Sequence, residues 1–225
     1  MMQFDSDRRS PPPLSNLTEC RPLAEIAPRV PFWKGTVFGA QGQPCTSLYI
    51  IVRGQVLLSR RGLDGEEYSA YLLAPGDLFG EGSLDPDRTW MVTARAVSDG
   101  AVHVLPSAQL PRFMQYYPEL GAHIVRLLGS RLARTHRRLD LVTSNCARER
   151  VLGLLRVMSD YHGQTRNGTI WLPVPITQSE LAEMVGLARE TVARVLTTLE
   201  TEGLLRREGR RGFWLKEPAE AELAP

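Results

Sequence analysis

The segment RETVARVLTTLE, which begins at Arg189, contains two arginines and a glutamate whose chemistry suits the edges of DNA bases. At about 100° per residue of a helix, Glu190 and Arg194 fall on one side, with Arg189 beside them at the N-terminal end. The opposite side is apolar through Val192 and Leu196. Arginine can donate two hydrogen bonds to guanine, and glutamate can accept one from cytosine. Because Glu190 precedes Arg194 by four residues, the pair is equally compatible with a surface ion pair, so the surrounding elements must decide.

The surrounding residues predict a helix-turn-helix followed by a basic hairpin. In TQSELAEMVGLARETVARVL, Ala182 lies four residues before Gly186. A small side chain lets two helices approach closely, and glycine can take the left-handed backbone conformation that the turn requires. In the following LLRREGRRGFWL, Arg210 and Arg211 are placed to contact DNA phosphates. We interpret the region as a winged helix-turn-helix whose second helix faces the major groove, in preference to a helical hairpin of an unrelated bundle.

The N-terminal half of the chain is expected to form short strands. SLYIIVRGQVLL predicts two strands joined by a tight turn at Arg53, and RRGLDGEEYSAYLL carries a hairpin signal at Asp64. TWMVTARAVSDGAVHVL supplies two further strands around Asp99, whereas LAPGDLFGEGSLDPD is rich in Gly, Pro and Asp and predicts a loop. Short strands at regular spacing indicate a β-sandwich or roll.

A long helix is predicted to begin at Pro118, because proline suits the first turn of a helix. Apolar residues recur along it at spacings of three and four, which is typical of a packing seam. On a helix between two domains, we expect the partner to be the same helix of a second subunit, giving a homodimer. The expected dimer seam consists of Ile124, Leu128, Leu132, Leu139 and Val142.

The composition of the chain limits where it acts. Its 225 residues are 43% hydrophobic and 23% charged, as in a globular protein, and the net charge is only +2. No apolar run approaches the roughly 18 residues of a membrane span, and MMQFDSDRRSPPPLSN lacks the apolar core of a signal peptide. We therefore expect a cytoplasmic chain with no membrane partner.

The sequence lacks the signatures of the enzyme and metal-site classes that we considered. GxSxG, Walker and GxGxxG motifs are missing, and His103 of the roll has no HxH partner, which a cupin metal site would need. Cys20, Cys45 and Cys146 are too scattered for a disulfide framework or an iron–sulfur cluster. We predict no catalytic residue and no metal site.

Over nearly its whole length the chain resembles the cyclic-AMP receptor protein (CRP/FNR) superfamily of bacterial transcription regulators. The resemblance rests on LYIIVRGQV, LAPGDLFGE, the long helix after Pro118 and ITQSELAEMVGLARETVARVL. It implies a homodimer bound to double-stranded DNA, with RNA polymerase as a protein partner. RETVARVL is similar to the CRP branch, which implies that Arg189, Glu190 and Arg194 read an inverted repeat of TGTGA type.

The resemblance also implies an α+β fold: an N-terminal cyclic-nucleotide-binding-like β-roll, a long dimerisation helix and a C-terminal winged helix-turn-helix. The expected divisions are a flexible tail at 1–30, the roll at 31–117, the helix at 118–144, the winged helix-turn-helix at 145–217 and a tail at 218–225.

DNA backbone contacts are implied for Thr177, Gln178 and Thr191. The chain departs from the family at Ala188, where Ser or Thr often caps the recognition helix. Loss of such a cap costs about 1 kcal/mol, so we expect weaker affinity with an unchanged base preference.

The effector pocket retains only part of the pattern of cyclic-nucleotide binders. The Gly-Glu pair that holds the ribose in such proteins is present as Gly80 and Glu81. The family's adenine-contacting Thr-Ser pair falls on Thr135 and His136, so half of it is retained.

The position of the phosphate-binding Arg-Ser pair is the main departure. Counting forward from the Gly-Glu pair without a gap places Trp90 and Met91 there, and neither can neutralise a phosphate. A shortened loop would instead offer Arg88 and Thr89, which have suitable chemistry. We favour the ungapped alignment and expect a regulator that is not controlled by cyclic AMP or needs no effector.

Several alternatives remain open at this point. One is a cyclic-AMP-dependent regulator of the same fold, and another is a haem sensor with His103, His123 or His136 as axial ligand. An apolar ligand beside Trp90 and Met91 is a third. A remote alternative is a cyclic-nucleotide-binding-like module whose C-terminal unit binds protein instead of DNA.

Overall fold

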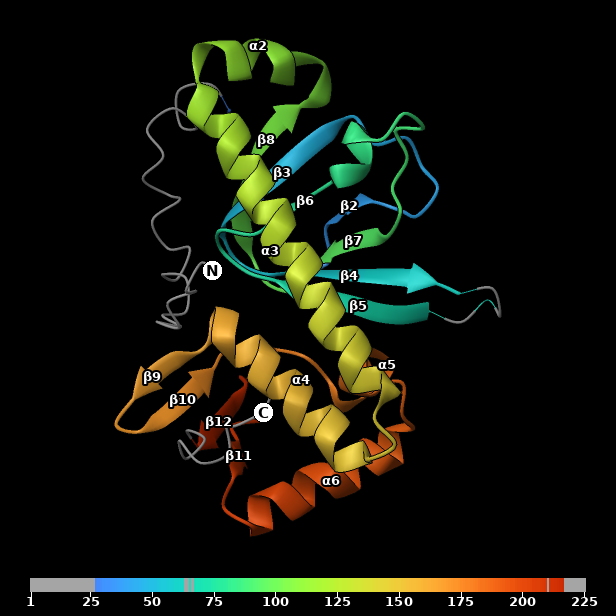
Figure 1. The fold of residues 1–225 in the computed structure, drawn as a ribbon, viewed down its shortest axis with the longest axis vertical. Helices are drawn as coiled ribbons and strands as arrows, with labels where there is room; N and C mark the ends of the chain where they lie inside the picture. Colours follow the sequence, from blue (N-terminus) through green and yellow to red (C-terminus); the bar gives the residue numbers. More distant parts are fainter. Residues whose placement is uncertain (1–26, 63–64, 66, 210, 217–225) are drawn as a thin grey trace, which may run out of the picture.

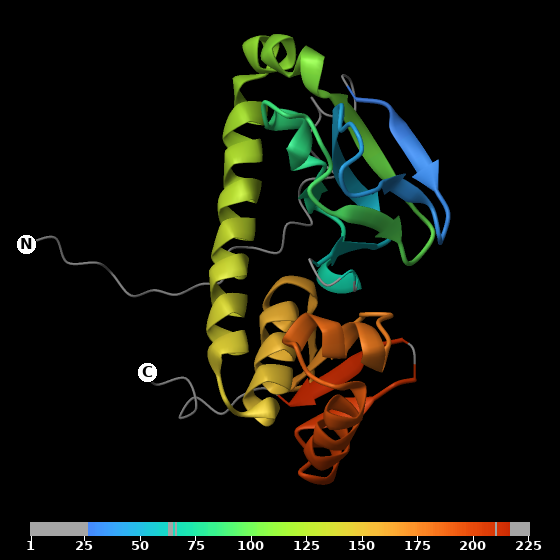
Figure 2. The same ribbon diagram turned by 90° about the vertical axis from the view of Figure 1, so that its right-hand side faces the viewer.

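The computed structural model describes residues 27–216 except 63, 64, 66 and 210, and Arg210 therefore lies outside the described residues. An N-terminal β-roll and a C-terminal helical domain lie on the same side of one long helix, α3 (Figures 1 and 2). This arrangement confirms the predicted α+β fold class.

The roll consists of two four-stranded sheets with the orders β1-β8-β3-β6 and β2-β7-β4-β5. Strand β1 begins two residues before the predicted start of the roll, and the segment expected to be a loop contains β6 and the short 3-10 helix η2. The elements are β1 (Arg29–Phe32), β2 (Val37–Gly39), β3 (Ser47–Arg53), β4 (Val56–Arg61), β5 (Glu67–Leu73), β6 (Leu78–Phe79), η2 (Glu81–Leu84), β7 (Thr93–Ala96) and β8 (Gly100–Pro106).

Two glycine turns carry the chain from one sheet to the other. Strands β3 and β4 flank Gly54 but do not pair with each other, because β3 pairs with β8 and β4 with β5 and β7. Gly54 has a φ of +88°, and a Cβ there would lie 2.6 Å from the carbonyl oxygen of Asp99. A Cβ at Gly100 would clash with the carbonyl oxygen of Arg53, so the two turns pack directly against each other. The Asp64 hairpin signal lies outside the described residues, although β4 and β5 do pair as antiparallel neighbours.

Helix α3 (Pro118–Thr143) follows the 3-10 helix η3 (Ser107–Gln109) and the short helix α2 (Leu110–Tyr116). Pro118 occupies the first turn of α3, as the sequence predicts. Leu120, Ile124 and Leu127 are buried against the roll, where they share a core with Leu48 and Leu105.

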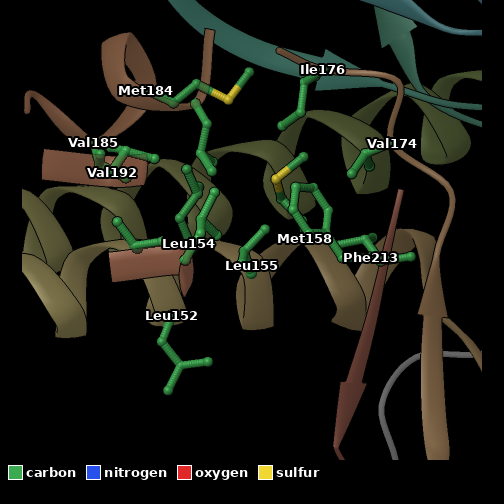
Figure 3. Close-up of a cluster of buried hydrophobic side chains, with 14 of the residues drawn as sticks. Leu152, Leu154, Leu155, Met158, Val174, Ile176, Met184, Val185, Val192 and Phe213 are labelled. Carbon is green, nitrogen blue, oxygen red and sulfur yellow. The ribbon is translucent and has the colours of Figure 1, made fainter. Parts of the chain in front are cut away.

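The C-terminal domain packs three helices on a four-stranded sheet with the order β11-β12-β10-β9. Figure 3 shows how its core gathers side chains from α4, α5 and the sheet. The hairpin of β9 and β10 was missed from the sequence, although its Asn167-Gly168 turn is a strong signal and both residues have positive φ. The elements are α4 (Ala147–His162), β9 (Gln164–Arg166), β10 (Thr169–Leu172), α5 (Gln178–Val185), α6 (Arg189–Thr201), β11 (Leu205–Arg207) and β12 (Phe213–Lys216).

The roll and the C-terminal domain meet in a common core. Leu57 of β4 and Leu72 of β5 belong to the same buried cluster as Leu154, Leu155 and Met158 of α4. None of these side chains is more than 7% exposed. Burial of apolar area therefore stabilises the contact between the domains as well as each domain by itself.

Within the part of the chain that the structure describes, no helix is both long enough and apolar enough to cross a membrane.

Candidate DNA interface and sensor region

The turn between α5 and α6 has the geometry that its sequence predicts. Thr177 caps α5: its hydroxyl accepts from the backbone N–H of Glu180 at 3.2 Å, and the Glu180 carboxylate accepts from the N–H of Thr177 at 2.6 Å. Gly186 ends the helix with φ +64° and ψ +44°. The N–H of Leu187 then donates to the carbonyl of Ala182 at 3.0 Å, which closes the turn.

Helix α6 buries one face and exposes the other. Val192, Leu196 and Leu199 are fully buried, whereas Arg189, Glu190 and Arg194 are exposed. Figures 1 and 2 place α6 at the end of the molecule that is farthest from the roll, so the roll does not cover the exposed face.

The side chains of this face are largely uncommitted. The guanidinium of Arg194 donates to the hydroxyl of Thr191 at 3.5 Å, which is a weak hydrogen bond. Among the described residues no ion pair joins Arg194 to Glu190, so the surface ion pair that their spacing would allow is not formed in this structure. Ala188 is the N-cap of α6 and makes no side-chain cap, so backbone donors at this end stay available.

The hairpin of β11 and β12 forms the wing. Glu200 of α6 accepts hydrogen bonds from the side chain and the backbone N–H of Arg207, which fixes the wing to the helix. These bonds, the side-chain bond first, hold the pKa of Glu200 below its ordinary value. Arg211 at the tip has an 81% exposed side chain and lies 3.7 Å from Glu208.

A hollow of about 400 Å³ opens between the N-terminal ends of α5 and α6 and the wing. Thr177, Gln178 and Arg189 line it together with Arg207. Three of the predicted DNA-contacting residues, which come from two different helices, therefore lie around one depression. Helix N-termini carry partial positive charge, which favours a phosphate at such a position.

One side of α3 faces neither domain (Figure 2), and α3 carries a stripe of exposed apolar residues. Val125, Leu132 and Leu139 are 68%, 58% and 56% exposed, and they recur every seven residues. Leu128 is half-buried beside them, and Val142 is 36% exposed. The assignment of Ile124 to this seam is wrong, because it is only 6% exposed and faces the roll. The missed residue is Val125, which the seven-residue spacing indicates.

The Gly-Glu pair of the predicted sensor region packs against neighbouring parts of the fold. Gly80 has φ +83°, and a Cβ there would lie 2.5 Å from the carbonyl oxygen of Ser47. The Glu81 carboxylate pairs with the guanidinium of Arg131 of α3 at 3.0 Å, a partner that the sequence did not indicate.

The two α3 residues predicted to contact an effector lie on different sides of the helix. Thr135 meets the roll, where the hydroxyl of Tyr71 donates to it at 2.7 Å. His136 is exposed, on the side of the helix that carries the seam. The structure therefore brings only one of them toward the roll.

The other four predicted pocket residues do not converge either. Trp90 is 5% exposed and packs on the rings of Tyr49 and Phe79, whereas Met91 is 50% exposed. Arg88 is exposed, and the backbone of Thr89 forms an isolated antiparallel β-bridge with Pro44. A Cβ at Gly39 would clash with the indole of Trp90, so the indole fills the interior of the roll.

Each half of the chain matches a known domain family. Residues 29–117 match the cyclic nucleotide-binding domain family, and residues 149–220 match the Crp-like helix-turn-helix domain family. The "CRP-like cAMP-activated global transcriptional regulator" of Mycobacterium tuberculosis is 33% identical over 188 residues, which are 80% of this chain and 81% of that protein. The chain belongs to the CRP/FNR family of transcription regulators.

A second relative and a solved structure are also similar to this chain. The "Cyclic AMP receptor protein" of Thermus thermophilus is 34% identical over 167 residues, which are 74% of each chain. The solved structure of FixK2 from Bradyrhizobium japonicum has the same fold, with a TM-score of 0.72, 22% identity and coverage of 86% of this chain and 93% of that one. As a CRP/FNR protein, the chain is a DNA-binding regulator, and its family consists of regulators and not of enzymes.

Proposed function

We propose that this CRP/FNR regulator reads an inverted repeat of TGTGA type through Arg189, Glu190 and Arg194. The observation that carries the proposal is the exposed polar face of α6, whose guanidinium groups are not consumed by ion pairs in the described part of the chain. A free arginine fork can bond guanine O6 and N7, and a glutamate can accept from cytosine N4. The buried opposite face fixes the helix while these groups enter the major groove.

Backbone contacts complete the proposed interface. Thr177 and Gln178 lie around the same hollow as Arg189, which supports their role beside a phosphate. Thr191 lies one turn of α6 away from Arg194 and contacts it. Arg211 and its neighbour Arg210 are assigned to phosphates beside the wing, Arg211 because its side chain is 81% exposed.

We propose a homodimer that forms through the exposed face of α3. Val125, Leu132 and Leu139 provide an exposed apolar stripe of heptad period along α3. An exposed stripe of this kind is unfavourable in water, and pairing with a second α3 would bury it. The two α6 helices would then address half-sites about 34–36 Å apart, one helical turn of DNA.

We also propose that cyclic AMP does not control this regulator. The Glu81 carboxylate, which would face a ribose, is already paired with Arg131. The indole of Trp90 fills the interior of the roll, and Arg88 is exposed at its surface. These residues do not fit a cyclic phosphate, because burying an anion without a free cation is very costly.

We also propose that RNA polymerase is a protein partner of this regulator and that the regulator acts in the cytoplasm. Relatives include a "Transcriptional activator protein FnrA" of Stutzerimonas stutzeri, 26% identical over 200 residues. An activator of transcription has to act on the polymerase at a promoter, so we assign this chain the same partner and the compartment that holds the DNA.

Fluorescence anisotropy tests the proposal directly. A duplex with a TGTGA inverted repeat is titrated at fixed salt against a scrambled duplex of equal length, with and without cyclic AMP. We expect discrimination of at least about 1,000-fold that cyclic AMP leaves unchanged. Discrimination that emerges only with cyclic AMP would contradict the effector proposal, and equal affinity for both duplexes would contradict the base-reading proposal.

A further inference from the structure

Three arginines of α3 converge where this helix crosses from the roll to the C-terminal domain. Arg131 and Arg138 lie 5.4 Å and 4.9 Å from the ring centre of Tyr71 of β5. Arg134 lies 4.7 Å from the ring centre of Tyr161 of α4. The DNA interface uses none of these groups, because they are turned toward the interior of the molecule.

The charges of this cluster do not balance. Arg131 pairs with Glu81 at 3.0 Å. Arg134 pairs with Asp77 at 2.8 Å. Arg138 has no carboxylate partner among the described residues, and its burial lowers its pKa. Three guanidinium groups thus share two carboxylates in a region of low dielectric, where an uncompensated charge is costly.

A cavity of about 30 Å³ lies beside Arg134 and Arg138. It exceeds the roughly 10–15 Å³ that one water needs, so it has room for an ion little larger than water. Arg134 is 7% exposed, and its Nε–H has no hydrogen-bond partner in the described structure. His162 also lines the cavity, and burial lowers its pKa, so its imidazole adds no positive charge near pH 7.

We propose that this cavity binds a compact monovalent anion, of the size of chloride or formate, between the guanidinium of Arg138 and the Nε–H of Arg134. Such an anion supplies both the missing negative charge and the missing acceptor. The other donor of Arg138 is bonded to the carbonyl of Met184 at the end of α5, at 2.7 Å.

The position of the cavity couples the anion to the arrangement of the domains. Its walls come from β5 of the roll, from α3, and from α4 and α5 of the C-terminal domain. A ligand that binds only the docked arrangement stabilises it by mass action. The site is separate from the predicted effector residues at Gly80 and Trp90, and its occupant is an anion instead of a nucleotide.

Thermal unfolding of the full chain tests this inference. Tm is measured at constant ionic strength and pH with sodium chloride, bromide, formate or acetate replacing a salt of the bulky sulfonate HEPES. At about four times the dissociation constant we expect the compact anion to raise Tm by about 2–4 °C. A response to halides alone assigns a free halide, and one that includes formate and acetate assigns the carboxylate of a small organic acid.

Matched variants decide whether the effect comes from this cavity. Arg138→Gln should abolish the rise, whereas Arg137→Gln, at an exposed neighbouring cation, should keep it. Val157→Leu adds a methylene at the cavity wall without changing any charge, and it should abolish the rise while the fold is retained. Bromide-soaked crystals should give an anomalous peak between Arg134 and Arg138. Equal rises in Tm for the wild type and Arg138→Gln, or no bromide peak at this place, would overturn the proposal.

Discussion

Two arginine side chains of the C-terminal domain differ in how far their hydrogen-bond donors are already used within the protein. Arg194 makes one weak hydrogen bond, at 3.5 Å to Thr191. Binding to DNA would therefore break little hydrogen bonding that this side chain has in the free protein. Arg207 is committed to Glu200 through its side chain and its backbone, so it holds the wing in place. Both side chains carry the same charge, so charge does not distinguish the two roles. The hydrogen-bond partners of each guanidinium distinguish them.

Replacement of Arg194 should alter base preference more than general affinity. We expect Arg194→Ala to lose about 1–3 kcal/mol of discrimination at one base position of the half-site. Anisotropy titrations against duplexes with single base changes measure it. Arg211→Ala is the matched control, because loss of a phosphate contact weakens all duplexes alike and lowers the salt dependence by about one counterion. Unchanged preference in Arg194→Ala would remove Arg194 from the base-reading set.

The Glu200–Arg207 pair should make the stability of the chain depend on pH. Hydrogen bonding lowers the pKa of Glu200 in the folded chain below its ordinary value of 4.5. The stabilisation is therefore complete above about pH 5.5 and is lost as the pH falls through the lowered pKa. Urea unfolding of the wild type and Glu200→Gln over this range should give a difference that shrinks in acid. A difference that is constant from neutral pH to below the ordinary value would contradict this assignment.

Helix α3 serves two partners with two faces. Leu120, Ile124 and Leu127 are buried against the roll, and the stripe of Val125, Leu132 and Leu139 is open. An ordinary surface helix of a monomer would carry polar residues on its second face. The proposed homodimer explains why α3 has a second apolar face in addition to the one that is buried against the roll.

A charge in the middle of the open stripe should dissociate the proposed dimer. We expect Leu132→Lys to weaken self-association by about 100-fold or more, because two lysines would meet at the seam without a counter-charge. Size-exclusion chromatography with light scattering measures the shift from dimer to monomer. Arg137→Gln on the same helix, whose exposed side chain pairs with Asp160 at 3.3 Å, should leave the dimer intact. A Leu132→Lys chain that stays dimeric would place the interface elsewhere.

The spacing of apolar residues in the sequence predicted the helices and strands well, but it predicted poorly which surfaces they pack against. The Gly186 turn and the start of α3 at Pro118 follow from local chemistry, so the sequence was enough for them. Ile124 and Val125 are adjacent apolar residues, and only the position of the roll decides which of them is buried. The pairing of Glu81 with Arg131 joins residues 50 positions apart, and no local pattern encodes such a contact.

At the scale of the whole molecule, an edge strand of the roll is covered by the C-terminal domain. Strand β5 ends its sheet, and the Glu183 carboxylate of α5 accepts from the backbone N–H of Ser69 at 3.0 Å and from its hydroxyl at 2.6 Å. The side-chain amide of Gln55 donates to the carbonyl of Pro173 at 2.7 Å. Edge strands left open invite unwanted pairing, so this contact protects the roll while it positions α5.

Loss of the Glu183 carboxylate should loosen the joint between the domains. Glu183→Ala leaves two donors of Ser69, a 4% exposed residue, without their acceptor, which we expect to cost about 1–3 kcal/mol. Hydrogen–deuterium exchange should then be faster in both β5 and α5. Glu190→Ala, an exposed carboxylate on α6, is the control and should leave these amides protected. Unchanged protection of β5 in Glu183→Ala would mean that the apolar contact alone holds the domains together.

The common core of the two domains has a consequence for how such regulators can be recombined. Leu57 and Leu72 belong to strands of the roll, yet they share a buried cluster with side chains of the C-terminal domain. A chimera that joins this roll to a DNA-binding domain taken from a relative would leave two leucines facing a surface that was selected for other side chains. We therefore expect substitutions at these positions to need compensating changes in α4, although separate domain families match the two halves of the chain.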